Sequence, residues 1–105
     1  MEKPNLFYIQ NMLGGDTGFE QKLINIIKAE FPEEQQTYQN CISSKDYKAT
    51  SEIVHKLKHK ISILGLEKSY QVAAAYELKL LDGQLDLKEE FELILATITN
   101  YLQEI

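Results

Sequence analysis

The sequence predicts an all-α protein, a single domain over residues 1–105 that forms an antiparallel four-helix bundle with a short additional N-terminal helix. Apolar residues recur three and four positions apart along most of the chain, which is the spacing of one helix face. Short breaks separate the segments that carry this spacing. No segment alternates apolar and polar residues next to a hairpin turn, as strands would. Four long amphipathic segments joined by short loops are typical of an antiparallel bundle.

The first predicted element is a short helix over residues 6–13, LFYIQNML, which Gly14 and Gly15 end. It precedes the first long helix of the bundle and is expected to cover one end of it.

The second predicted helix covers residues 16–42. Thr17 and Glu20 have the spacing of a capping box, in which the two side chains satisfy free backbone N–H groups of the first turn. Pro32 removes one backbone donor, so it either kinks this helix or begins a new one. We favour one long, kinked helix, because apolar residues continue the helical spacing beyond the proline. Those before it are Phe19, Leu23, Ile26, Ile27 and Phe31, and those after it are Tyr38, Cys41 and Ile42.

Three more helices are predicted in the second half of the chain. Residues 43–64 form the third helix, which Ser43, Ser44 or Asp46 can cap and Gly65 ends. The fourth, alanine-rich, covers residues 67–83. The fifth covers residues 86–105, with Asp86 and Glu89 as a second capping box. Its apolar seam comprises Leu87, Phe91, Ile94, Ile98, Tyr101 and Ile105.

The third predicted helix carries both histidines of the chain. Each helical residue advances about 100° around the axis, so four apolar side chains cluster on one side and form its core face: Val54, Leu57, Ile61 and Leu64. His55 lies about 140° from the centre of this cluster and should face water, and His59 lies almost opposite the core. The alternative is an ordinary solvated face with two histidines of no special role.

Positive and hydroxyl side chains accompany His55 on this face. Lys48, Ser51 and Ser62 fall on the same side of the helix, and Lys58 lies on its flank. A neutral imidazole is a good nucleophile near pH 7, because the ordinary pKa of histidine is about 6.5. It can accept a phosphoryl group on a ring nitrogen, and a nearby lysine can stabilise the phosphoryl oxygens. The sequence has no GxxxxGK[ST] nucleotide loop, so we expect a carrier of phosphate without kinase activity of its own.

The segment VHKLKHKISILG, residues 54–65, resembles the signature of the histidine-containing phosphotransfer (HPt) domain. That motif has an apolar residue and a lysine shortly after the histidine, and an apolar–glycine pair ending ten residues after it. The matching residues here are His55, Leu57, Lys58, Leu64 and Gly65. Tyr76-Glu77 resembles the apolar–acidic pair on the family's next helix, and GGDTGF resembles the start of its second helix. The resemblance covers the length and helix count of the entire chain.

The resemblance implies a function in two-component phosphorelay signalling. His55 would be the phosphoacceptor and Lys58 the supporting cation, with Lys48, His59, Ser62 and Ile63 on the docking face. The partner would be the receiver domain of a response regulator or of a hybrid sensor histidine kinase. The aspartate and Mg²⁺ of that receiver would supply the transfer chemistry, so the chain itself would need no cofactor.

His59 departs from the family pattern, which usually has glycine at this position. A small residue leaves room for the incoming receiver domain. An imidazole one turn from His55 would crowd that approach, hydrogen-bond the phosphoryl group or redirect partner choice.

Two other functions compete with phosphotransfer. Glu52, His55 and His59 are spaced so that they share one helix face, where the two histidines could chelate zinc or copper, although a stable site would need a further ligand from another element. The other alternative is a helical adaptor, or degenerate phosphotransfer domain, that binds a partner without accepting phosphate. Ile63 would then serve as an outward apolar contact, unless it is buried under the first helix.

Composition limits the remaining classes. The net charge of −5 argues against nonspecific nucleic-acid binding, which needs surplus lysine and arginine. A single cysteine, Cys41, forms no internal disulfide and suits a reducing, cytoplasmic location. The first residues do not resemble a signal peptide, and no apolar run is long enough to span a membrane. We expect a monomer, because a carrier meets its partners one at a time.

Overall fold

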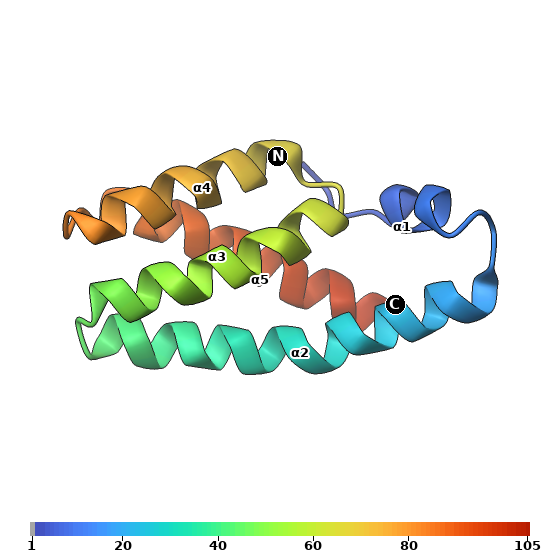
Figure 1. Ribbon diagram of the computed structural model, residues 1–105, viewed down its shortest axis with the longest axis horizontal. Coiled ribbons are helices and arrows are strands. Elements are labelled where there is room, and N and C mark those ends of the chain that lie inside the picture. The colour runs from blue at the N-terminus through green and yellow to red at the C-terminus, as the bar shows by residue number, and fades with distance from the viewer. Residues whose placement is uncertain (1) are drawn as a thin grey trace.

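The computed structural model describes residues 2–105, which form five helices and, within that range, no strand. The predicted all-α class is therefore confirmed. The helices are α1 (Phe7–Met12), α2 (Thr17–Ser43), α3 (Tyr47–Ile63), α4 (Glu67–Leu81) and α5 (Lys88–Glu104). α3 lies between α2 and α4, and α5 runs behind them in the view of Figure 1. α3 packs against both α2 and α4, and α5 packs against α4 and α2.

The core follows the apolar faces of the long helices. Val54, Leu57, Ile61 and Leu64 are fully buried, as the helical spacing of α3 predicts. Two buried tyrosines join three helices at the centre: the Tyr38 hydroxyl of α2 lies 2.8 Å from the Tyr76 hydroxyl of α4 and donates to Glu92 of α5 at 2.9 Å. Burial and the neighbouring carboxylate raise the pKa of Tyr38, so it stays protonated and can donate.

The predicted apolar stripe of α2 is partly wrong. Phe19 and Ile26 are 58% and 50% exposed. Four residues of the predicted stripe are buried as expected: Ile27, Phe31, Tyr38 and Ile42. Ile24, which the predicted stripe does not include, is buried with them. The packing of α3 and α5 against α2 thus turns the buried face away from Phe19 and Ile26.

Helix α2 runs without a break through Pro32, as expected for one long helix. Its start differs from the prediction. Asp16 is the N-cap, with a carboxylate oxygen that accepts from the backbone N–H of Phe19 at 3.2 Å, so Thr17 is already helical. The second predicted capping box is also wrong: α5 begins at Lys88 after Leu87, and Asp86 forms an ion pair with Lys79 at 3.1 Å instead of capping the helix.

The turn after α3 holds the N-terminal segment in place. Gly65 has φ +78, and a Cβ there would lie 2.6 Å from Nδ2 of Asn5, so glycine suits both the backbone and the contact. The Asn5 backbone N–H donates to the Leu64 carbonyl at 2.9 Å. The Glu2 carboxylate accepts from the backbone N–H groups of Lys68 and Ser69, each at 2.9 Å, and so caps α4 from outside the helix.

Candidate functional site

His55 lies on the exposed side of α3 and faces a carboxylate from α4. Its side chain is 51% exposed, which agrees with the predicted solvent-facing position. Nδ1 of His55 lies 2.8 Å from Oε2 of Glu77. An ionised carboxylate can accept but not donate, so Nδ1 carries the proton. In the neutral ring, the lone pair is then on Nε2, at the other edge of the imidazole.

Two further contacts hold Glu77 in position. Nζ of Lys58 lies 2.9 Å from Oε1 of Glu77, and the Ser51 hydroxyl donates to the Glu77 backbone carbonyl at 2.8 Å. Burial would raise the pKa of the Glu77 carboxyl, but the hydrogen bonds from Lys58 and His55 outweigh it, so the pKa lies below its ordinary value. Glu77 is therefore ionised near neutral pH and orients the His55 ring.

The Lys58 side chain is more buried than its place on the flank of the helix indicates. Its side chain is 13% exposed, and its Nζ lies 5.6 Å from the centre of the Tyr70 ring as well as on Glu77. The ammonium group is thus fixed beside the histidine as part of a His55–Glu77–Lys58 triad, defined by the two contacts to the Glu77 carboxylate. Ser51 also differs from expectation, because it is buried and joins α3 to α4 instead of facing water.

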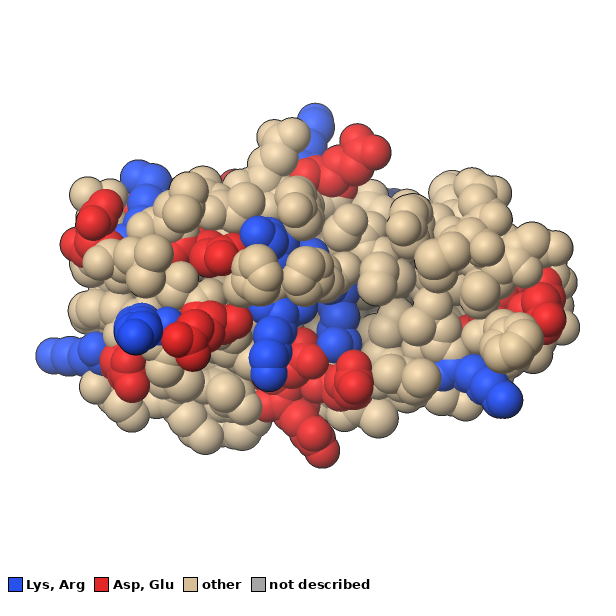
Figure 2. Space-filling model, viewed as in Figure 1, with Lys and Arg blue, Asp and Glu red and all other residues tan. Residues whose placement is uncertain are grey.

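A shallow hollow lies beside His55, between the first half of α3 and the end of α4. Lys48 lines it, as its predicted place on this face implies. The other lining residues are Ser51, Glu52, His55, Lys56, Glu77 and Leu81. Figure 2 shows lysines gathered over the middle of α3 with acidic residues on both sides. The hollow beside His55 therefore has positive charge at its edge, from Lys48 and Lys56.

The remaining predicted residues lie further along α3. His59 is exposed, and its ring is perpendicular to that of His55, with centroids 5.0 Å apart. Ser62 is exposed two turns beyond His55 and outside the hollow. Ile63 is partly buried and packs against the core.

The surface metal alternative would need a ligand beyond the two histidines. Across residues 2–105, no group of three or more His, Cys, Asp or Glu side chains is arranged to hold a metal ion. His55 and His59 are close, but Nδ1 of His55 is already engaged with Glu77.

Glu77 is the site residue that sequence reasoning missed. Tyr76-Glu77 resembles the apolar–acidic pair of the family, but nothing in the spacing predicts contact with a histidine 22 residues earlier. The packing of α4 on α3 creates that contact.

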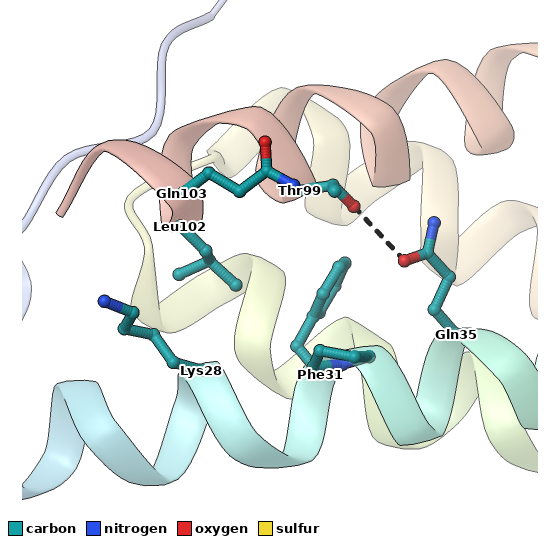
Figure 3. Close-up of a pocket in the computed structure, with 7 residues that line it drawn as sticks. Lys28, Phe31, Gln35, Thr99, Leu102 and Gln103 are labelled. Atoms are coloured by element: carbon teal, nitrogen blue, oxygen red, sulfur yellow. Dashed lines mark hydrogen bonds between the residues drawn. The ribbon is translucent and has the colours of Figure 1, made fainter.

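A second hollow lies between α2 and α5, away from the histidines (Figure 3). Phe31 and Leu102 line its apolar part, and the Thr99 hydroxyl donates to Gln35 at 3.2 Å across it. Lys28 is the one ionisable residue among those that line it, so this hollow has no pair of groups for acid–base or nucleophilic chemistry.

None of the helices within residues 2–105 is both long and apolar enough to cross a membrane. Comparison with protein-family models, with curated protein sequences and with solved structures found no match. The candidate function therefore depends on the geometry of the His55–Glu77–Lys58 triad.

Proposed function

We propose that this protein is a phosphorelay carrier of the histidine-containing phosphotransfer type, in which α2 to α5 form an antiparallel four-helix bundle that presents His55. The observation that carries the proposal is the contact between Nδ1 of the exposed His55 and Glu77. It leaves Nε2 as the nucleophilic nitrogen on a side chain that a second protein can reach. The partner is a cytoplasmic receiver domain of a response regulator or hybrid sensor histidine kinase.

The transfer step follows from this arrangement. The Nε2 lone pair attacks the phosphorus of the receiver's aspartyl phosphate, and the bond from phosphorus to the aspartate oxygen breaks. The aspartate leaves as a carboxylate, and the proton on Nδ1 stays in place. The ring becomes positively charged in the phosphorylated state, and the Glu77 carboxylate at 2.8 Å stabilises that charge. In the reverse direction, the same contact holds the ring for transfer to another receiver.

Lys58 would bind the phosphoryl group in addition to its contact with Glu77. Its ammonium group is held on the Glu77 carboxylate, one helical turn from His55. A phosphoryl group carries more negative charge than a carboxylate, so it would attract the Lys58 ammonium more strongly than Glu77 does. The transfer needs no further catalytic group from this chain. Phosphoryl transfer depends mainly on positioning and charge neutralisation, which the receiver and its Mg²⁺ supply.

The decisive experiment is incubation with a phosphorylated receiver domain and Mg²⁺, followed by intact-mass and acid-lability measurements. The wild-type protein should gain one acid-labile phosphate, and His55→Gln should remain folded and gain none, because the exposed side chain adds little to the core. His59→Gln, one turn along the same helix, is the matched control and should still accept phosphate. Failure of the wild type with several receivers would favour the adaptor function, in which the face binds partners without phosphate.

His59→Gly tests the departure from the family pattern. Removing the ring 5.0 Å from His55 should keep or increase the rate of transfer, because it opens the approach to Nε2. Glycine inside a helix should lower the free energy of unfolding by about 1 kcal/mol, and His59→Ala should show the same kinetics without that loss. A large fall in the transfer rate for both variants would show that the His59 ring takes part in transfer.

A further inference from the structure

The outward face of α2 carries an exposed apolar stripe with charges at its edges. Phe19 and Ile26 are 58% and 50% exposed and lie seven residues apart, so they stand almost in line along the helix. The residues that join this helix to the core lie on a different side, at Ile24, Ile27 and Phe31. Exposed aromatic and aliphatic side chains aligned on one helix are typical of a surface that another helix covers.

Two side chains of opposite charge flank Ile26 on this stripe. Lys22 lies four residues before Ile26, and Glu30 lies four residues after it. Both are within about 40° of Ile26 around the helix axis. A second copy of α2 that packs antiparallel with the two-fold axis at Ile26 would bring Lys22 of each chain to the level of Glu30 of the other, where the two long side chains can meet across the contact. The small, exposed Ala29 lies at the edge of the same stripe.

Glu30 can take part in such a contact while it keeps its partner within the chain. Its Oε1 lies 3.0 Å from Nζ of Lys60, yet its side chain remains 55% exposed. Lys60 also has Glu34 at 2.8 Å, so it does not depend on Glu30 alone. Lys22 lies over the exposed Phe19 ring, 5.5 Å from its centre, on the same stripe.

We propose that the protein forms a two-fold symmetric dimer through this face of α2, with Ile26 at the axis. A self-complementary stripe is what a two-fold interface requires, since each surface patch must match its own copy. The partner is thus a second copy of this chain. His55 lies on α3 and contacts Glu77 of α4, so the proposed interface on α2 uses neither of these two helices. Figure 1 shows α3 between α2 and α4. The inference is independent of the proposed phosphotransfer, and it differs from the monomer expected from the sequence.

The stripe from Phe19 to Glu30 is about 17 Å long, so the interface is small and the dimer should dissociate on dilution. Sedimentation equilibrium from micromolar to millimolar protein should show exchange between the 12.1 kDa chain and a particle of twice that mass. Ile26→Asp should abolish the dimer. Leu93→Asp is the matched control, because Leu93 is 58% exposed on α5 and lies outside the stripe. A wild type that is monomeric throughout this range would overturn the proposal.

Charge reversal tests the pairing itself. Lys22→Glu and Glu30→Lys should each weaken self-association by at least about tenfold, because each creates two like-charge contacts across the axis. An equal mixture of the two variants should associate again, since a mixed dimer has two opposite-charge contacts. Circular dichroism of each variant checks that the fold is retained. If the mixture does not associate again, the antiparallel pairing is excluded.

A cysteine at the axis provides a test that does not depend on charge. With Cys41→Ser to remove the native thiol, Ile26→Cys should form a disulfide dimer under mild oxidation, because the two copies of this position face each other. Leu93→Cys should remain monomeric under the same conditions. Equal cross-linking of both variants would mean random collision and would overturn the assignment of Ile26 to the axis.

Discussion

At the scale of single residues, Glu77 determines the chemistry available to His55. One carboxylate contacts the imidazole at 2.8 Å and the Lys58 ammonium at 2.9 Å, so it fixes the ring and the cation together. The depressed pKa of Glu77 keeps this contact intact well below neutral pH. The orientation of the His55 ring is therefore a property of the resting protein and does not require a bound partner.

Glu77→Gln should loosen this orientation while the fold is retained. A glutamine side chain has a similar size but no charge, so it holds the Nδ1–H form of His55 less strongly and leaves Lys58 without its carboxylate. The ¹⁵N spectrum of the imidazole should show a larger fraction of the Nε2–H tautomer, and the free energy of unfolding should fall by about 1–2 kcal/mol. His59, which has no contact with Glu77 at hydrogen-bond distance, serves as the internal control. An unchanged tautomer at His55 would contradict the assigned role of Glu77.

The sequence predicts the exposed residues of α3 better than their partners. Helix geometry alone places His55 on the water side and Leu57 in the core, because both follow from about 100° per residue. It does not place Ser51 or Glu77, because their contact joins residues 26 positions apart. Such contacts depend on the register in which α4 packs along α3. Local sequence patterns do not determine that register.

At the scale of the helices, the sequence predicts every helix but not every start. Adjacent residues Asp16 and Thr17 are both good N-caps, and the backbone decides between them. Asp16 is extended, with φ −73 and ψ 93, after the turn at the two glycines, so it caps the helix and Thr17 begins it. Asp86 forms an ion pair with Lys79 across the turn before α5. The N-terminus of α5 therefore has no side-chain cap.

Asp46→Ala and Asp86→Ala should differ in their effect on stability. Asp46 caps α3 by accepting from the Ala49 backbone N–H at 3.1 Å, so its loss should cost about 1 kcal/mol. Asp86 forms an exposed ion pair with Lys79, and such pairs contribute between about 0 and 1 kcal/mol. Urea unfolding of the two variants measures the difference. A larger loss for Asp86→Ala would mean that it caps α5 after all.

At the scale of the whole molecule, a few polar contacts join segments far apart in the chain. Lys60 of α3 lies within 3.0 Å of Glu30 and 2.8 Å of Glu34 on α2. Burial alone would lower the pKa of Lys60, but these carboxylates raise it overall, so the pair of helices stays joined at neutral pH. The Glu2 carboxylate fixes the N-terminal segment to the start of α4, 66 residues later.

Stability should therefore fall in acid as Glu2 and Glu77 become protonated. Burial would raise the pKa of each carboxyl, but hydrogen bonds outweigh it and leave both below the ordinary value of 4.5. Their contribution is fully present above the unfolded-state pKa and is lost as the pH falls through the lower folded-state pKa. The urea midpoint should decline below about pH 4.5, and Glu2→Gln should make that decline shallower. An acid decline of the same slope in Glu2→Gln would show that Glu2 adds nothing to it.

The hydrogen bond between Thr99 and Gln35 also has a consequence for the order of folding. It joins residues 64 positions apart, whereas the contact between His55 and Glu77 joins residues 22 apart. Closing the longer loop costs about 1 kcal/mol more chain entropy, so the α3–α4 hairpin should form before α5 docks on α2. Substitutions at the late α2–α5 contact would then mainly accelerate unfolding, and those between α3 and α4 would slow refolding. The histidine site would be assembled while the hollow between α2 and α5 is still open.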